Sequence, residues 1–333
     1  MYEADGLFIF VWRNCAMSIS SDARGSLRSG LASRRAANEI ANAIDLAVGG
    51  TTGTIFYVDS STGVDGTGSG RNEDTPFATL DFAIGECTAS KGDVILLMPG
   101  HAETIIADSG VDIDVAGITI IGLGRGADRA TFTFTTAVTA DFKLAAASTS
   151  VRNVLFLGGL DATTGVIEVT AADCELIDCE YRDVTGQATD VIITSVAADR
   201  LLIDGLRFIG AAGDGGDTAI ALVGCDDVTI RNCEFYGNFD LGAIECRTTA
   251  VVRLRVHDCQ IWTEGAEDLG ILDTITASTG IIGPNVNIFL QDNAANLTEA
   301  ITGATFVVMG ENHVANAVAE KSISINWTAA TDA

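Results

Sequence analysis

The segment Ile230-Arg-Asn-Cys-Glu-Phe235 decides the fold, because four other segments of the chain repeat its pattern. In each, a short apolar run is followed by an Asn or Asp, after which apolar and polar residues alternate. The other repeats are Val151–Phe156, Leu176–Tyr181, Leu202–Phe208 and Val256–Ile261. The Asn or Asp residues stand at 153, 178, 204, 232 and 258, so the intervals are 25, 26, 28 and 26. A period in this range without a helical pattern indicates a solenoid built from coils of short strands.

A second apolar series precedes the first in every repeat and predicts a second strand. Its members lie 25, 28, 24 and 28 residues apart: Ile167, Ile192, Ile220, Ile244 and Leu272. The alternation in Val166–Val169 is typical of a strand. Three strands per turn, each parallel to its neighbours in adjacent turns, would form an all-β, right-handed parallel β-helix.

The repeat also divides the chain. We place the β-helix at residues 111–284 and a capping first part at residues 51–110, in which Thr79–Cys87 predicts a short helix. After Pro284 the period fades, so we expect residues 285–333 to form a separate, small β-rich segment. Residues 1–50 are predicted to be an arm with an Ala-rich helix. We interpret residues 1–16 as untranslated upstream sequence or a disordered extension, with a hydrophobic anchor as the alternative.

The charge of the chain restricts its partners. Lys and Arg number 19 against 45 Asp and Glu, a formal net charge of −26. Such an acidic surface repels nucleic acid and anionic membranes, so we expect neither as a partner. No stretch approaches the 18 apolar residues of a membrane-spanning helix. The arm is slightly basic, and its arginines Arg24, Arg28, Arg34 and Arg35 are candidates for docking onto a larger particle.

The eight cysteines do not read as a disulfide framework. Cys179, Cys233 and Cys259 occupy one repeat position, which we align with Val154 and Gly205. A position that accepts Val, Gly and Cys is a small core slot, where a free thiol behaves as a small hydrophobe. We therefore expect reduced thiols and synthesis in a reducing cytoplasm, although stacked strands are close enough for a bridge.

The strongest candidates for catalysis are Glu180, Arg207 and Glu234, which follow the Asn/Asp position on the outer face. The two glutamates would lie two strand spacings apart, roughly 9.6 Å, near the upper limit of the carboxylate pair of an inverting glycosidase. A cross-strand charge ladder on a solvated face is the alternative that we favour. Trp262, with Glu264 and Glu267 nearby, is a candidate glycan contact.

Other polar motifs fit structural roles. Asp226-Asp227 directly precedes a strand, which favours a turn. The three histidines, His101, His257 and His313, show no metal-ligand spacing. The loop with Asp59, Asp65 and Asp74, and the segment Asp214–Asp217, contain oxygen ligands suited to Ca²⁺ without a full ligand pattern. We therefore predict no metal and no cofactor.

The segment Tyr57–Asp59, the Gly-rich loop after it and Asp74–Leu80 resemble the start of many phage and bacterial parallel β-helix proteins. Gly92–Ile95 continuing through Met98–Thr104 is similar to predicted phage structural proteins. The repeats resemble the generic pectate-lyase-like β-helix, without lyase or polygalacturonase motifs. The resemblance covers roughly residues 54–280, and a weak one adds Asn312–Val318. It identifies the fold more specifically than the function, since this fold hosts many functions.

The resemblance implies a non-enzymatic phage structural protein located in the virion. We expect a capsid decoration or head-fibre subunit, anchored by its arm to the major capsid protein or another virion protein and assembled as a homotrimer. The alternative is a tailspike-like protein that binds or cleaves polysaccharide, with Glu180, Glu234 and Trp262 at its site. A bacterial surface adhesin is a third, less favoured possibility.

Overall fold

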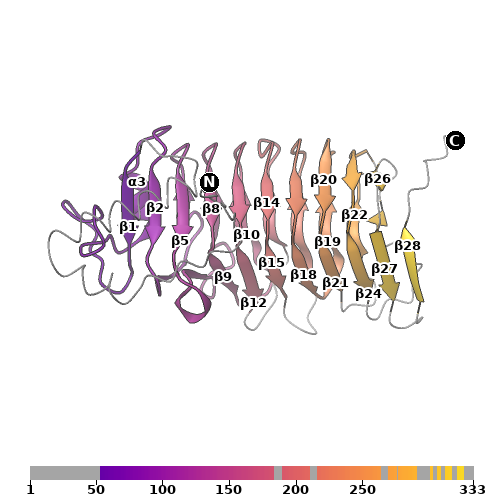
Figure 1. The fold of residues 1–333 in the computed structure, drawn as a ribbon, viewed down its shortest axis with the longest axis horizontal. Coiled ribbons are helices and arrows are strands. Elements are labelled where there is room, and N and C mark those ends of the chain that lie inside the picture. Colours follow the sequence, from indigo (N-terminus) through magenta and orange to yellow (C-terminus); the bar gives the residue numbers. More distant parts are fainter. Residues whose placement is uncertain are drawn as a thin grey trace, which may run out of the picture. The chain divides into compact units, whose positions relative to one another are not determined.

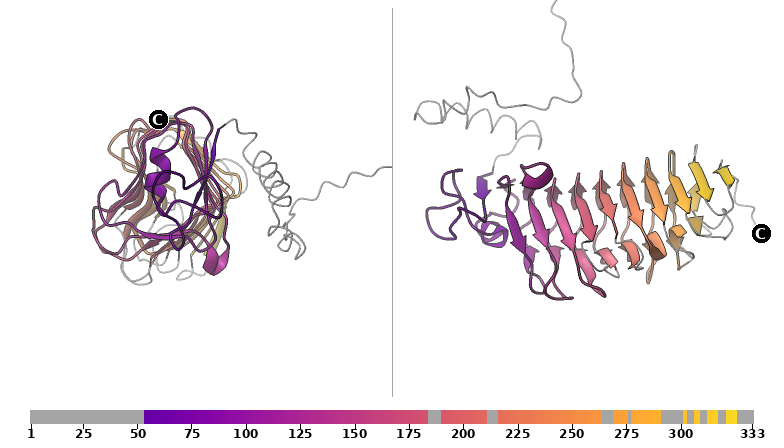
Figure 2. Two further views of the ribbon diagram at one scale, coloured as in Figure 1. Left: turned by 90° about the vertical axis from the view of Figure 1, so that its left-hand side faces the viewer. Right: turned by 90° about the horizontal axis from the view of Figure 1, so that it is seen from below.

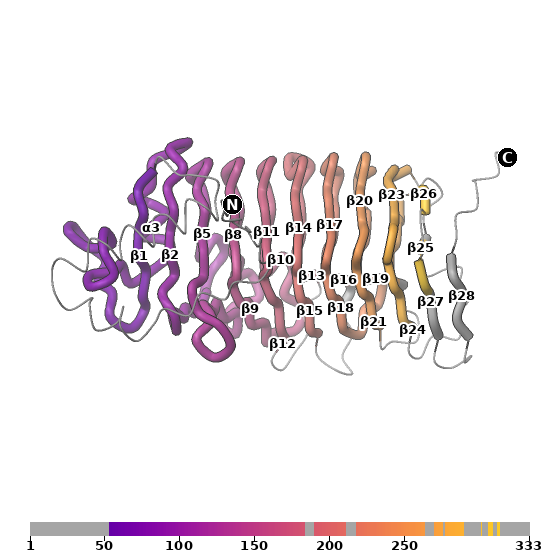
Figure 3. Tube along the Cα trace, viewed as in Figure 1, coloured from indigo at the N-terminus to yellow at the C-terminus, as the bar shows by residue number. Residues whose placement is uncertain are grey.

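The computed structural model describes residues 53–183, 190–210, 216–263, 269–275, 277–290, 301–302, 306–308, 312–316 and 321–325. The predicted arm, with Arg24, Arg28, Arg34 and Arg35, lies outside these residues. The regular secondary structure of the described part is almost all strand, with one short α-helix, α3 (Leu80–Gly85), and one 3₁₀ turn, η1 (Gly126–Asp128). Successive turns of the chain stack side by side along one axis (Figures 1 and 3).

The turns build three sheets, and within each turn the chain visits sheets 1, 2 and 3 in that order. Sheet 1 contains β1 (Ile55–Val58), β2 (Val94–Leu97), β5 (Thr119–Gly122), β8 (Ser150–Arg152), β11 (Glu175–Ile177), β14 (Leu202–Asp204), β17 (Thr229–Arg231), β20 (Leu254–His257), β23 (Gly280–Ile282) and β26 (Phe306–Val308). Sheet 2 contains β3 (Ala102–Thr104), β6 (Thr131–Thr133), β9 (Leu155–Gly158), β12 (Glu180–Asp183), β15 (Arg207–Ile209), β18 (Glu234–Gly237), β21 (Gln260–Thr263), β24 (Asn287–Leu290), β27 (Asn312–Asn316) and β28 (Lys321–Ile325). Sheet 3 contains β4 (Val111–Ile113), β7 (Phe142–Leu144), β10 (Thr164–Val169), β13 (Asp190–Thr194), β16 (Gly216–Leu222), β19 (Phe239–Cys246), β22 (Leu269–Asp273) and β25 (Ile301–Thr302).

Strands of consecutive turns pair in parallel throughout the body of the molecule, as β11 does with β14 and β12 with β15. The predicted all-β parallel β-helix is therefore confirmed. Seen end-on, the turns follow one closed outline, and α3 lies at its N-terminal end (Figure 2). Thr79 caps α3 through a hydrogen bond from the Phe82 amide, and the helix buries Leu80, Ala83 and Ile84 in the core.

The corner between sheets 1 and 2 explains the Asn/Asp of the repeat. Asn153, Asp178, Asn232 and Asp258 all have a positive φ of 52–54°. Asn and Asp tolerate this left-handed conformation better than other residues with a Cβ, because their short side chains can hydrogen-bond locally. Each corner thus turns the chain from one sheet to the next within two residues.

One member of the repeat was aligned wrongly. Asp204 pairs with Arg231 inside the sheet, so Gly205 stands opposite Asn232 and adopts the corner conformation, with φ of 71°. Glycine needs no compensating hydrogen bond there, because it has no Cβ to clash. The corrected corner positions are 153, 178, 205, 232 and 258, and the Cys slot is shared with Leu206 instead of Gly205.

The interior is a set of apolar stacks that run from turn to turn. Cys179, Cys233 and Cys259 are at most 1% exposed and lie in the predicted core slot as free thiols. Tyr181 stacks on Phe208 with 5.1 Å between ring centroids, and Phe208 is followed by Phe235 in the next turn. Each buried aromatic or aliphatic side chain stabilises the fold by about 1.5–3 kcal/mol relative to its exposed state.

The acidic residues of the capping part hold its loop. Asp59 accepts hydrogen bonds from Ser61 and Thr62, and Asp65 accepts them from the amides of Ala78 and Thr79. These bonds account for two of the carboxylates that the sequence offered to Ca²⁺. Within the described ranges, no group of three or more Asp, Glu, His or Cys residues converges on a common point. Asp214, from the second candidate segment, lies outside those ranges.

The β-helix also continues past the predicted boundary at residue 284. Strand β24 pairs in parallel with β21, and β26 and β27 extend sheets 1 and 2 in the same way. Only β28 departs, because it pairs antiparallel with β27. The period fades in the sequence because the links between these strands change, while the strands keep their places in the stack.

Candidate functional site

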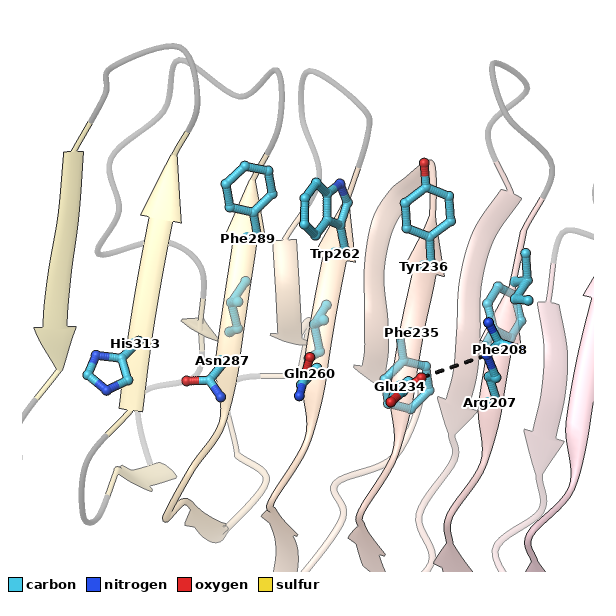
Figure 4. A pocket seen from close by; sticks show the side chains of 13 residues that line it. Arg207, Phe208, Glu234, Phe235, Tyr236, Gln260, Trp262, Asn287, Phe289 and His313 are labelled. Atoms are coloured by element: carbon cyan, nitrogen blue, oxygen red, sulfur yellow. Dashed lines mark ion pairs between the residues drawn. The ribbon is translucent and has the colours of Figure 1, made fainter.

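The outer face of sheet 2 carries a groove of about 610 Å³ that crosses five strands, from β15 to β27. Its lining residues come from corresponding positions of successive turns (Figure 4). They are Arg207, Phe208, Ile209, Glu234, Phe235, Tyr236, Gln260, Ile261, Trp262, Asn287, Ile288, Phe289 and His313. Phe208, Phe235, Ile261 and Ile288 point into the core, so the side chains that face solvent alternate with them along each strand.

An aromatic row forms one side of the groove. Tyr236, Trp262 and Phe289 are partners in the strand register, so they stand in three consecutive turns. Their ring centroids are 6.2 Å and 4.1 Å apart, and the rings line up across the strands (Figure 4). Tyr236 is 39% and Trp262 is 41% exposed, well above what large aromatic side chains show in a core. The row is therefore a platform that presents ring faces to solvent.

A polar row runs parallel to the aromatic one, two residues earlier in each strand. It consists of Arg207, Glu234, Gln260, Asn287 and His313, again in register. The side-chain amides of Gln260 and Asn287 make no hydrogen bond to the described residues, while each can offer two donors and an acceptor. The central part of the groove therefore combines apolar ring faces with uncharged hydrogen-bonding groups.

The charged end of the polar row is the predicted ladder. Arg207 lies 3.7 Å from Glu180 in the preceding turn and 3.7 Å from Glu234 in the following one. The prediction that this ladder lies on a solvated face is correct for Glu234, whose side chain is 63% exposed, and wrong for Glu180, which is only 9% exposed. The reason is Arg129, which follows η1 and covers Glu180 with an ion pair of 2.9 Å. Glu180 also pairs with Arg182.

This arrangement separates the two candidate catalytic carboxylates. Glu180 is held by three arginines and does not line the groove. Glu234 is the carboxylate that the described residues contribute to the groove, and it pairs with Arg207. A glycosidase needs one carboxyl group as acid and a second as base or nucleophile on either side of the scissile bond. The described residues of the groove do not supply that pair.

The other predicted site residues have structural roles or fall elsewhere. Asp227 takes a left-handed turn conformation and pairs with Arg253, as expected for a turn. His101 is fully buried and bonds to Glu103, and His257 bonds to Asp258. Only His313 of the three histidines lines the groove. Glu264 and Glu267 lie outside the described residues.

Trp262 is thus the predicted glycan contact that the structure places in a groove. The sequence analysis missed its neighbours Tyr236 and Phe289, and the amides of Gln260 and Asn287. The signal was present, since Tyr236 and Trp262 each stand four residues after a corner Asn or Asp, and Phe289 stands four after Asn285. Counting from every corner would have assembled both rows.

Comparisons with known proteins find distant likenesses of fold. A solved rhamnogalacturonan lyase matches 77% of this chain and 87% of its own length at 14% identity, with a TM-score of 0.44. A protein titled Geobacillus virus E2 ORF18 matches 84% of this chain and 64% of its own length at 13% identity, with a TM-score of 0.30. No protein-family model and no curated protein matches the chain. At these scores neither structure carries a functional argument.

Proposed function

We propose that this chain is a phage structural protein, carried on the virion, that binds a polysaccharide along the groove of sheet 2 without cleaving it. The observation that carries the proposal is the aromatic row Tyr236–Trp262–Phe289 beside the uncharged amides of Gln260 and Asn287. The C–H groups on the face of a sugar ring are attracted to the negative face of an aromatic ring. The hydroxyl groups at the edge of the sugar need donors and acceptors. The two rows meet both requirements.

Binding without cleavage is supported by the state of the carboxylates. Glu180 is covered by Arg129 and cannot reach a ligand in the groove without breaking a nearly buried ion pair. Glu234 is a single carboxyl group, and both the inverting and the retaining two-carboxylate mechanisms need a second one across the glycosidic bond. The proposal therefore keeps the non-enzymatic role expected from the sequence and gives the β-helix a ligand.

The virion location rests on the sequence resemblance. Separately, the described residues contain no helix with the length and apolar composition of a membrane span. Attachment is assigned to the arm, through Arg24, Arg28, Arg34 and Arg35. The expected partner is the major capsid protein or another virion protein, and a trimer would let a weak single contact suffice by multivalency. A capsid decoration presenting this groove would concentrate the particle on a glycan-coated surface.

The test is a screen of the purified full chain against polysaccharides, with two variants. Trp262→Ala removes the centre of the platform, and Ile281→Ala is a matched control because Ile281 is 40% exposed on sheet 1. We expect retention on at least one polysaccharide, weakened about fivefold or more by Trp262→Ala, taking as a guide the about 1–3 kcal/mol that a nucleic-acid base gains by stacking on one aromatic ring. Ile281→Ala should bind like the parent protein.

Each part of the proposal has its own contrary result. Failure to bind any polysaccharide would refute the binding role. Release of new reducing ends or unsaturated products during long incubation would establish the polysaccharide-cleaving alternative instead. Mass spectrometry of purified particles tests the location, because absence of the chain from the virion would refute the structural role.

A further inference from the structure

We infer that the polysaccharide is uncharged and lies across the strands, along the axis of the β-helix, with about one sugar unit per turn. The inference rests on the proposed function and narrows it to a ligand class and a binding direction. It is carried by the charges in the groove, by the direction of the two rows and by the strand spacing.

The charges of the groove are already matched within the protein. Among the described residues that line the groove, one is an arginine, Arg207, and it lies between the carboxylates of Glu180 and Glu234. An anionic sugar would have to compete with these two carboxylates for the guanidinium group, whose charge they already offset. The full chain adds a net charge of −26, which repels a polyanion at long range. Both the ion pairs of Arg207 and the net charge of the chain therefore disfavour a polymer of uronic or sialic acid.

The centre of the groove suits neutral sugars. Trp262 and Phe289 lie beside Gln260 and Asn287, whose amides can donate to and accept from hydroxyl groups. Neither amide carries a charge that would require a counter-charge on the ligand. Their side chains are not tied to other described residues, so a ligand does not have to break protein hydrogen bonds first.

The direction follows from the register. Both rows run perpendicular to the strands, and adjacent strands are about 4.8 Å apart. An extended chain of pyranose rings repeats at about the same spacing, so successive sugars can meet equivalent side chains in successive turns. The groove crosses β15 to β27, four strand spacings or roughly 19 Å, which accommodates about four sugar units.

The experiment is isothermal titration of the full chain with two oligosaccharide series of two to six units, one neutral and one containing a uronic acid, each derived from polysaccharides of the screen. We expect the neutral series to bind, with affinity rising up to about four units and then levelling off, as the length of the groove requires. Its affinity should change less than about twofold between about 50 and 500 mM NaCl, because no ion pair is formed. The uronic acid series should bind at least about tenfold more weakly.

A charge variant separates this inference from the proposed function. Gln260→Lys places a cation beside Trp262 and should raise the affinity for the uronic acid series at low salt, while Gln260→Ala should weaken neutral ligands only. Tighter binding of the uronic acid series by the unmodified chain, with strong salt dependence, would overturn the inference and leave a glycan-binding groove. Absence of binding in both series would overturn the groove as a glycan site. A concentration-dependent oligomer that Trp262→Asp dissociates would assign the aromatic row to contact between copies and overturn both.

Discussion

Replacing Glu180 with Gln should destabilise the protein far more than replacing Glu234 with Gln, although both residues belong to one ladder. They stand two strands apart in the same register position, and each lies 3.7 Å from Arg207. Their environments differ, because the Glu180 side chain is 9% exposed and that of Glu234 is 63% exposed. The pair of variants therefore measures what burial adds to an otherwise identical contact.

The magnitude follows from the partners that each change leaves behind. Removing the charge of Glu180 leaves the Arg129 guanidinium, which is only 15% exposed, with the Asp178 carbonyl oxygen as its remaining acceptor. Breaking a buried ion pair by removing one partner costs about 3–5 kcal/mol, and we expect roughly 2–4 because glutamine keeps one acceptor oxygen. Glu234→Gln removes an exposed pair and should cost about 0–1 kcal/mol.

Thermal unfolding followed by circular dichroism is a suitable assay, with both variants scanned at one rate beside the parent protein. At about 2 °C per kcal/mol, we expect the midpoint of Glu180→Gln to fall by roughly 4–8 °C and that of Glu234→Gln by about 2 °C or less. The double variant Arg129→Met/Glu180→Met should recover most of the loss, because an apolar pair of similar volume does not need the ion pair. Equal shifts for the two single variants would refute the reasoning, since they would show that Arg129 does not bury Glu180.

Three further predictions concern a buried acid, a corner glycine and the core thiols. Burial raises the pKa of Asp141 to about 6, and its Oδ2 has no hydrogen-bond partner among the described residues. The protonated Asp141 therefore favours the folded state below about pH 4, and this contribution to stability is lost as the pH rises through 6. Asp141→Asn should remove this loss, so its thermal unfolding midpoint should exceed that of the parent protein at pH 7 but not at pH 3.5. If variant and parent had equal midpoints at both pH values, the prediction would be contradicted. A Cβ at Gly205 would stand 2.6 Å from the end of the flexible Asp178 side chain, and the residue has a positive φ. Gly205→Val should cost about 2 kcal/mol or more in urea unfolding, because a β-branched residue is strained at this φ. Gly205→Asn adds the same Cβ but tolerates this φ, so it should cost less, about 1 kcal/mol. Burial raises the pKa of Cys179 to about 11, so iodoacetamide at pH 8 should modify it only in the unfolded chain, as peptide mass spectrometry would show.

The combination of an ion-paired carboxylate and an exposed aromatic row separates two functions that this architecture can serve. Glu180 and Glu234 have the strand separation that a glycosidase could use, yet Arg129 removes one of them from the groove. Trp262 is accessible because it occupies an outward position of its strand, in register with Tyr236 and Phe289. In the function that we propose, it is this Arg129 contact, from about 50 residues earlier in the chain, that favours binding over cleavage.

The architecture could be predicted from the amino-acid sequence alone. The spacing of corner residues such as Asn153, Asn232 and Asp258 predicted the coil, the outer ladder and the slot of the buried cysteines. It could do so because a strand has a period of two and each turn contacts only its neighbours, so local pattern and global position coincide. The exception at Gly205 arose because two residue types can satisfy the same left-handed corner.

Which outer residues line the groove could be seen only in the folded protein. The ion pair by which Arg129 covers Glu180 depends on the path of the chain after η1. The repeat pattern of the sequence contains no signal for that path. The alignment of Tyr236, Trp262 and Phe289 depends on a register across links of different length, which the pairing of β18, β21 and β24 fixes. A repeat states where each side chain points within its own turn, whereas a groove is a property of several turns stacked in register.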